Sequence, residues 1–158
     1  MGYIREVVVN APVEIVFRAW TSQAEAERWL APSANVTFAE GGAYEFFWCA
    51  DPDLDSTRGC RLVAIEPERR LVFEWQGNRN FIDLFRPPNE RTLVEARFLP
   101  APEPDRTTVV VEQRETRNLE GWVAYDEWMA DAWEEALQGL KRYCENADAA
   151  PYWQQRQR

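Results

Sequence analysis

Residues 122–137 have the sequence WVAYDEWMADAWEEAL, and this stretch decides which fold the chain can form. On a helical wheel of about 100° per residue, large side chains gather within about 60° of Trp122. The members of this stripe are Trp122, Tyr125, Asp126, Met129, Trp133, Ala136, Leu137, Leu140, Tyr143 and Cys144. Trp128 falls about 120° away, at the edge of the stripe or on the surface. A helix over about 119–145, capped by Asn118, therefore needs an apolar surface to cover.

Two shorter helices and a strand are predicted at the start of the chain. Residues 3–9, YIREVVV, have the composition of a strand, and Pro12 suits the first turn of a helix. The apolar face of that helix consists of Val13, Val16, Phe17 and Trp20. Ser22 and Glu25 form a capping box for a second, short helix, which Pro32 ends.

The middle of the chain has the alternating pattern of strands. After a turn signal at Gly41-Gly42, large rings alternate with other residues. The rings expected on one face are Tyr44, Phe46 and Trp48, and later Phe73 and Trp75 beside Leu71. Residues 91–99 and 106–115 predict two more strands, joined by a proline-rich turn. FIDLF at 81–85 is compatible with a short strand, and RPPNE at 86–90 with a loop.

The expected element order is β-α-α-β(5-6)-α, which defines an α+β fold. Strands joined by short turns pair antiparallel, and the last helix needs the sheet face as its cover. We therefore expect a curved antiparallel sheet wrapped around a long C-terminal helix. A single domain is predicted over 1–146, followed by a flexible tail over 147–158. Docking of the tail residues Tyr152 and Trp153 on the domain or on a partner is the alternative.

Composition excludes several classes of function. The net charge is −9 without a basic block, which argues against nucleic acid and against an anionic membrane surface as partners. The absence of histidine removes Ser-His-Asp triads and histidine metal ligands, so no metal and no cofactor are expected. Cys49, Cys60 and Cys144 have no zinc-motif spacing and are expected as buried, reduced thiols. With no signal peptide or membrane span in the pattern, a cytoplasmic location is expected.

The aromatic stripe permits two interpretations. Rings at helical spacing are most often ordinary core, but aromatic walls with a few polar groups are also typical of ligand pockets. Asp126 either pairs with a strand arginine (Arg61, Arg97 or Arg114) or faces a wet cavity. Gln113, on the inward face of its strand, either fixes a ligand or satisfies a neighbour. The candidate ligand-binding residues are Trp48, Phe73, Trp75, Gln113, Trp122, Asp126, Met129 and Trp133.

Five stretches in order resemble the family of proteins related to the activator of Hsp90 ATPase, in the START/Bet v 1-like (SRPBCC) superfamily. They are VNAPVEIVFRAWTSQAEAERWLAP, GGAYEF, EPERRLVFEW, RTTVVVEQRE and AWEEALQGLKRYCEN, within about residues 4–146. The resemblance implies a helix-grip fold with a cavity between sheet and helix. The sequence departs from the family pattern at Gln113, where family members often have histidine, and at Ala132, where they often have glycine. Residues 77–91 have the appearance of an insertion.

These observations together predict a protein that binds a small hydrophobic or aromatic molecule between the sheet and the last helix. No catalytic residue is assigned. One alternative is a cyclase- or hydrolase-type enzyme using Asp126 as acid or base. Another is a modulator of an Hsp90-type chaperone, weakened because the eukaryotic activator has a further N-terminal domain. A homodimer is left open.

Overall fold

The computed structural model of the protein describes residues 2–85, 91–114 and 121–155. The strands are β1 (Tyr3–Val9), β2 (Ser33–Val36), β3 (Tyr44–Phe47), β4 (Leu62–Glu66), β5 (Arg70–Trp75), β6 (Thr92–Pro100) and β7 (Thr107–Gln113). The helices are α1 (Val13–Thr21), α2 (Gln23–Trp29), the 3-10 helix η1 (Arg79–Phe85), α3 (Trp122–Glu145) and α4 (Tyr152–Gln155). None of the helices in these ranges is long and apolar enough to cross a bilayer.

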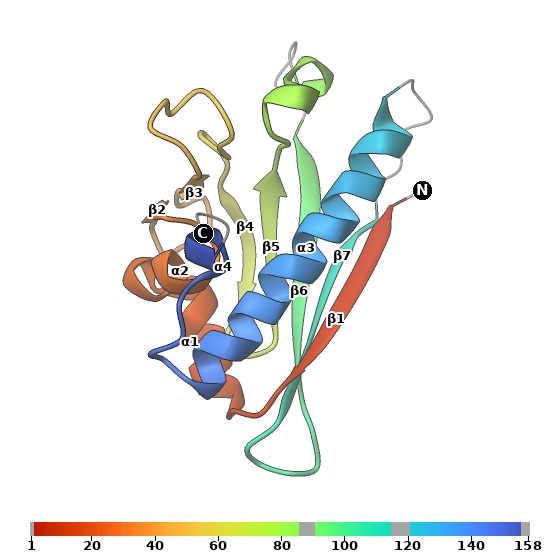
Figure 1. Ribbon diagram of the computed structural model, residues 1–158. Coiled ribbons are helices and arrows are strands. Elements are labelled where there is room, and N and C mark those ends of the chain that lie inside the picture. The colour runs from red at the N-terminus through yellow and green to blue at the C-terminus, as the bar shows by residue number, and fades with distance from the viewer. Residues whose placement is uncertain (1, 86–90, 115–120, 156–158) are drawn as a thin grey trace.

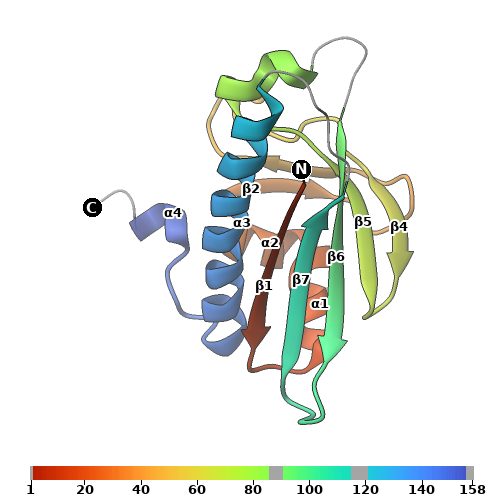
Figure 2. The ribbon, with the colours of Figure 1, turned by 90° about the vertical axis from the view of Figure 1, so that its right-hand side faces the viewer.

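One antiparallel sheet forms the frame of the molecule. Its five strands have the order β1-β7-β6-β5-β4, and β2 pairs with β3 separately. Tyr3 lies opposite Gln113, and Phe73 lies opposite Val94. Figures 1 and 2 show α3 running diagonally across one face of this sheet, with α1 and α2 on the same side. The predicted α+β architecture, a curved antiparallel sheet around a long C-terminal helix, is confirmed.

At the N-terminal helices the predicted Ser22 cap is confirmed, whereas Pro12, predicted as the first helical residue, is the N-cap of α1. The Ser22 hydroxyl accepts a hydrogen bond from the Glu25 backbone N–H at 3.4 Å, as expected for a capping residue. On α3, the predicted stripe is buried from Trp122 to Leu140. That helix begins at Trp122, with Gly121 as its N-cap at φ 92°, and the predicted cap Asn118 lies outside the described residues.

The prediction of a strand at 81–85 is wrong, because these residues belong to the 3-10 helix η1. Phe81 and Phe85 are the two rings of this segment that reach α3. Both rings pack edge-to-face on Tyr125, at centroid distances of 5.5 and 5.1 Å. Packing against the first turn of α3 therefore overrides the strand propensity. The loop expected at 86–90 lies outside the described residues.

The interior beneath the middle of α3 is filled by rings from α1 and α2. Trp20 is fully buried and stacks on Trp133 of α3, with centroids 5.8 Å apart and planes at 16°. Trp29 lies 4.9 Å from Trp20, and its indole N–H donates to the Ala19 carbonyl at 2.8 Å. Phe98 meets Trp20 from the sheet side at 5.8 Å. This cluster joins both short helices, the sheet and α3 into one core.

The end of the chain returns to the body as α4. The Tyr152 hydroxyl donates to the Leu30 carbonyl at 2.9 Å. The Trp48 indole N–H donates to the same carbonyl at 3.1 Å and to the Tyr152 oxygen at 2.9 Å. The docking of Tyr152 on the domain, one of the options left open, is the arrangement present. The flexibility expected of residues 147–158 stays a prediction.

All three cysteines are free thiols, and only Cys60 is fully buried. Burial raises the pKa of the Cys60 thiol to about 12, so it stays protonated and unreactive at neutral pH. Cys49 and Cys144 are partly exposed. The prediction of buried thiols is therefore confirmed for Cys60 and wrong for the other two. Cys49 lies in the loop after β3, and Cys144 lies in the last turn of α3.

Replacing Trp20 by Ala should lower the free energy of unfolding by about 3–5 kcal/mol, because it opens a cavity at the centre of the ring cluster. In a chain of this length that loss lowers Tm by roughly 6–20 °C, measured by thermal or urea unfolding. Trp128→Ala is the control, since Trp128 is 41 % exposed, and its expected cost is about 0.5 kcal/mol or less. Equal costs for the two variants would contradict the central role of Trp20.

Candidate functional site

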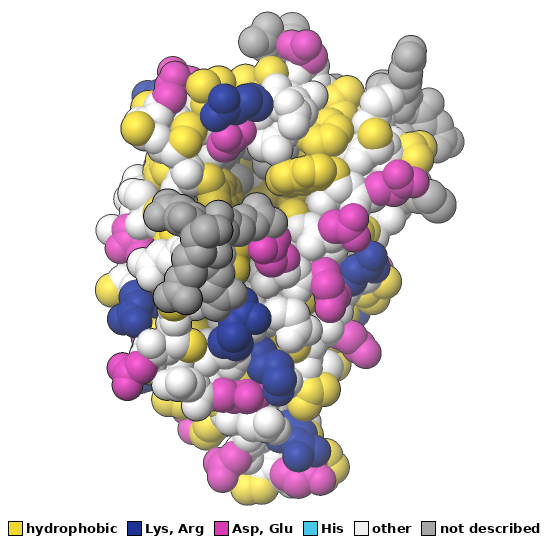
Figure 3. Space-filling view, viewed as in Figure 1, with side chains coloured by type: hydrophobic (Ala, Val, Ile, Leu, Met, Phe, Trp, Pro, Cys, Tyr) yellow, Lys and Arg dark blue, Asp and Glu magenta, His cyan; other side chains and the backbone are white. Residues whose placement is uncertain are grey.

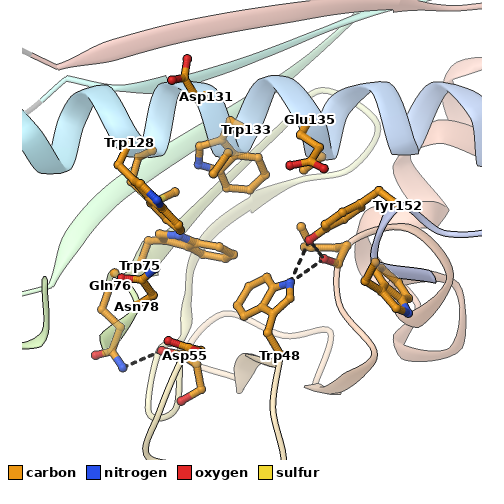
Figure 4. Close-up of a pocket in the computed structure, with 17 residues that line it drawn as sticks. Trp48, Asp55, Trp75, Gln76, Asn78, Trp128, Asp131, Trp133, Glu135 and Tyr152 are labelled. Atoms are coloured by element: carbon orange, nitrogen blue, oxygen red, sulfur yellow. Dashed lines mark hydrogen bonds between the residues drawn. The ribbon is translucent and has the colours of Figure 1, made fainter. Parts of the chain in front are cut away.

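A groove of about 540 Å³ opens at the side of α3, away from the filled interior. Its walls come from the residues after β3, the end of β5, the middle of α3, the end of α2, and α4. The rings that line it are Trp48, Trp75, Trp128, Trp133, Tyr152 and Trp153. In the space-filling view, hydrophobic side chains lie in a hollow on this face, and acidic side chains follow α3 beside it (Figure 3). Figure 4 shows the labelled rings around the space beside α3.

Strand alternation and strand ends decide which rings reach the groove. Phe73 and Trp75 both point inward from β5, but Phe73 is fully buried against Tyr44 at 5.0 Å. Trp75 is the last residue of β5 and is also buried, at 3 % exposure, but its ring borders the groove. It lies 5.0 Å from Trp133 and 6.1 Å from Trp48, and the Trp48 and Trp75 planes are set at 73°. The Trp48 and Trp75 rings therefore form a corner.

Hydrogen bonds fix several of these side chains in place. The indole N–H of Trp133 donates to the Tyr3 hydroxyl at 3.2 Å, and that of Trp48 donates to Leu30 and Tyr152. The polar groups at positions 48 and 133 are thus used inside the protein. Both rings therefore border the groove in fixed positions; Trp48 is partly exposed there, whereas Trp133 is 1 % exposed.

The polar part of the lining is mostly engaged as well. The Arg79 guanidinium donates to both carboxylate oxygens of Asp55, at 3.2 Å to Oδ1 and at 3.1 and 2.8 Å to Oδ2. This hydrogen bonding lowers the pKa of Asp55. The Gln76 amide donates to the Ser56 carbonyl at 2.9 Å. On α3, the carboxylate of Glu135 points toward the groove and that of Asp131 points away from the rings (Figure 4).

The predicted site residues divide into two groups in the structure. Trp48, Trp75, Met129 and Trp133 line the groove together. The other predicted residues, which do not line it, are Phe73, Gln113, Trp122 and Asp126. Phe73 belongs to the solid core, and Trp122 packs on Phe85 at 5.2 Å near the opposite end of α3. The eight residues therefore do not form one site.

Asp126 is held in a buried polar pair with Gln113. The carboxylate, 4 % exposed, accepts a hydrogen bond from the Gln113 amide at 3.1 Å. Within the described ranges it has no ion pair with Arg61, Arg97 or Arg114, so the first of the two alternatives, pairing with a strand arginine, is not present, and Asp126 does not line the groove either. The reason is strand alternation: Gln113 faces inward, while Arg114 and Arg97 lie on the outer face with Glu95 and Glu112. Burial raises the pKa of Asp126, and the Gln113 hydrogen bond partly offsets this.

Sequence reasoning missed several residues of the groove: Asp55, Gln76, Asn78, Trp128, Tyr152 and Trp153. For Trp128 a signal existed, because its place at the edge of the stripe puts it beside the buried face. For Tyr152 and Trp153 the signal was weaker: two adjacent rings in an otherwise polar segment indicate docking on another surface. Nothing in the pattern indicated that the segment after β3 lies against the end of β5.

Among residues 2–85, 91–114 and 121–155, no group of three or more acidic or cysteine side chains is arranged to hold a metal ion. The lining consists of rings, a thioether, two amide side chains and the carboxylates of Asp55, Asp131 and Glu135.

This fold and this cleft define a helix-grip domain of the Bet v 1-like class. The chain belongs to the family of Activator of Hsp90 ATPase homolog 1-like proteins, whose model matches residues 10–145. The family resemblance noted in the sequence is thereby confirmed. A search of curated proteins found no significant match.

Solved structures support the same fold. Protein MLL2253 from Mesorhizobium loti is 21% identical with a TM-score of 0.67, over 93% of this chain and 100% of that one. CalU16 from Micromonospora echinospora is 23% identical with a TM-score of 0.62, over 91% and 76%. The Aha1 dimer from Colwellia psychrerythraea is 13% identical with a TM-score of 0.70, over 94% and 99%. At these identities the likeness concerns the fold alone.

The buried Asp126 predicts a pH-dependent cost to stability. Its pKa is higher in the folded than in the unfolded chain, so the native state binds more protons between the two values. The free energy of unfolding therefore falls as pH rises through that window. We expect the change in the free energy of unfolding caused by Asp126→Asn to be more favourable at pH 7 than near pH 3, by on the order of 1 kcal/mol. Urea unfolding at the two pH values measures this difference.

The matched control is Glu127→Gln, an exposed carboxylate on the same helix, for which no such difference is expected. If the effect of Asp126→Asn were the same at both pH values, the carboxylate would not be the group whose burial is costly.

Proposed function

We propose that the protein is a cytoplasmic binding protein for a small, largely apolar or aromatic ligand, held in the groove beside α3. The observation that carries the proposal is the set of converging tryptophan rings around about 540 Å³ of space. Clefts of about 300–1,000 Å³ with aromatic walls and few polar groups are typical of small-molecule sites. Family membership points in the same direction.

The rigidity of the walls favours binding. Ordering flexible side chains at an interface costs free energy, typically about 0.5–1.5 kcal/mol for each one immobilised. Trp48 and Trp133 are already held by hydrogen bonds to Leu30, Tyr152 and Tyr3. A ligand that packs on these rings therefore binds without the free-energy cost of ordering their side chains.

An enzymatic role through Asp126 receives no support from this geometry. The carboxylate lies outside the groove and is bonded to Gln113. A ligand in the groove would therefore not meet it as an acid or base. A chaperone-modulating role, suggested by the name of the family, is the second candidate. It predicts association with an Hsp90-type chaperone and a changed ATPase rate, whereas the ligand-binding proposal predicts neither.

Filling the groove should abolish binding without unfolding the protein. Ala132 lies in the wall on α3, and Ala132→Phe places a ring in the space. We expect the affinity for N-phenyl-1-naphthylamine, a neutral fluorescent aromatic probe, to fall by roughly tenfold or more in a fluorescence titration. The unfolding midpoint should change little.

Ala124→Phe is the matched control, since Ala124 is exposed on the same helix and does not line the groove. Its affinity for the probe should equal that of the wild type. Equal binding by both variants, or no saturable binding by the wild type to neutral aromatic and lipid-like probes, would contradict the proposal.

A further inference from the structure

We infer that the groove selects a neutral ligand that carries a hydrogen-bond acceptor, such as the carbonyl group of an aryl ketone, and that the indole N–H of Trp75 is the donor that recognises it. This inference rests on the proposed ligand-binding function of the groove and adds the chemical class of the ligand. It follows from which indole N–H groups of the lining are hydrogen-bonded and which are not.

The tryptophans of the lining differ in what their N–H groups contact. Those of Trp48 and Trp133 donate to groups of the protein. Within residues 2–85, 91–114 and 121–155, nothing accepts a hydrogen bond from the N–H of Trp75, although this residue is only 3 % exposed. A buried tryptophan N–H usually has a hydrogen-bond partner. The N–H of Trp75 is therefore available to another molecule.

The contrast with Trp20 shows that the Trp75 donor can be reached. The Trp20 nitrogen also lacks a partner, but it is sealed in the core, and Trp20 does not line the groove. The Trp75 ring borders the groove, and its nitrogen is not among the sealed, unpartnered atoms of the described chain. The small exposed part of Trp75 therefore includes the donor nitrogen.

The other unbonded donors of the lining are more open to solvent. Trp128 is 41 % exposed, and Trp153 and Asn78 are partly exposed. Such donors can keep water as a partner beside a bound ligand, so they discriminate little between ligands. Figure 4 shows Asn78 on the same side of the space as Trp75. The buried donor of the lining is thus the one at Trp75.

Burial makes this donor selective. A ligand that packs against the Trp75 edge excludes water from its N–H. A ligand with an oxygen acceptor at that point replaces the lost hydrogen bond, whereas a hydrocarbon of the same shape leaves the N–H buried and unpaired. Sites that hydrogen-bond one ligand reject an analogue without the bonding group for this reason. The groove should therefore distinguish a ketone from its hydrocarbon isostere.

The groove favours a neutral acceptor over a carboxylate. None of the described residues in its lining is a lysine or an arginine. The guanidinium of Arg79 is occupied by both carboxylate oxygens of Asp55. A carboxylate that gave up its water in this part of the protein would meet an N–H donor but no cation of the described lining.

Three naphthalene compounds of nearly the same shape test the inference on the full chain. They are the ketone 2-acetylnaphthalene, the hydrocarbon 2-isopropenylnaphthalene and the anion 2-naphthoate. Their affinities are measured by displacement of N-phenyl-1-naphthylamine. We expect the ketone to bind about threefold or more tightly than the hydrocarbon, and the anion to bind most weakly.

An NMR titration of the wild-type protein observes the hydrogen bond itself. The indole N–H signal of Trp75, assigned by its loss in Trp75→Phe, should move further downfield with the ketone than with the hydrocarbon. Both compounds carry the same naphthalene ring, so the difference between them reports the hydrogen bond and not the ring. This measurement does not depend on the stability of any variant.

Trp75→Phe removes the N–H and keeps an aromatic ring. We expect the ratio of ketone to hydrocarbon affinity to fall by about threefold or more in this variant. Trp128→Phe is the matched control, because it removes a solvent-exposed indole N–H from the same groove, and its ratio should equal that of the wild type. Thermal unfolding checks that both variants are folded.

The results separate this inference from the proposed function. If the wild type binds the hydrocarbon as tightly as the ketone, and the Trp75 signal responds equally to both, the acceptor preference is overturned while the groove remains a binding site. A ratio that falls in Trp128→Phe and not in Trp75→Phe overturns the assignment of the donor to Trp75. Tightest binding of the anion overturns the neutral class. If none of these compounds binds, and N-phenyl-1-naphthylamine also fails, both proposals fall.

Discussion

The stacking of Trp20 on Trp133 is the contact on which the rest of the arrangement depends. It joins α1 to α3 at the point where α3 crosses the sheet, and it is completed by Trp29 and Phe98. These rings are buried and fill the space where α1, the sheet and α3 meet. The space that remains is displaced to the side of α3, where the sheet ends at Trp75 and a loop and the short helix α4 form the opposite wall.

The Leu30 carbonyl links this wall to the core. It follows α2 and accepts hydrogen bonds from both Trp48 and Tyr152, so one backbone group positions a loop ring and the returning end of the chain. Such an arrangement couples the shape of the groove to segments that are distant in sequence. The opposite wall depends on Trp133, whose N–H is fixed by Tyr3 of β1. The positions of the groove walls thus depend on residues of β1, α2, α3, α4 and the loop after β3.

Much of the fold was predictable because it follows from local periodicity. The helical stripe around Trp133, the capping box at Ser22 and the alternation in β5 each rest on neighbouring residues. The site was predictable only in part. Periodicity shows that Phe73 and Trp75 share a face, but only tertiary structure shows that Trp75 borders the groove and that Phe73 does not. Likewise, the return of Tyr152 depends on contacts more than a hundred residues apart.

The most direct test of the account is an NMR titration that follows the indole N–H signals of the eight tryptophans as a saturating aromatic ligand is added. The account predicts the largest shifts at the tryptophans that line the groove, which are Trp48, Trp75, Trp128, Trp133 and Trp153. Trp20, Trp29 and Trp122 should stay nearly unchanged, because they lie in the solid interior or at the far end of α3. Dominant shifts at Trp20 and Trp29 would place the ligand beneath the helix and contradict the account.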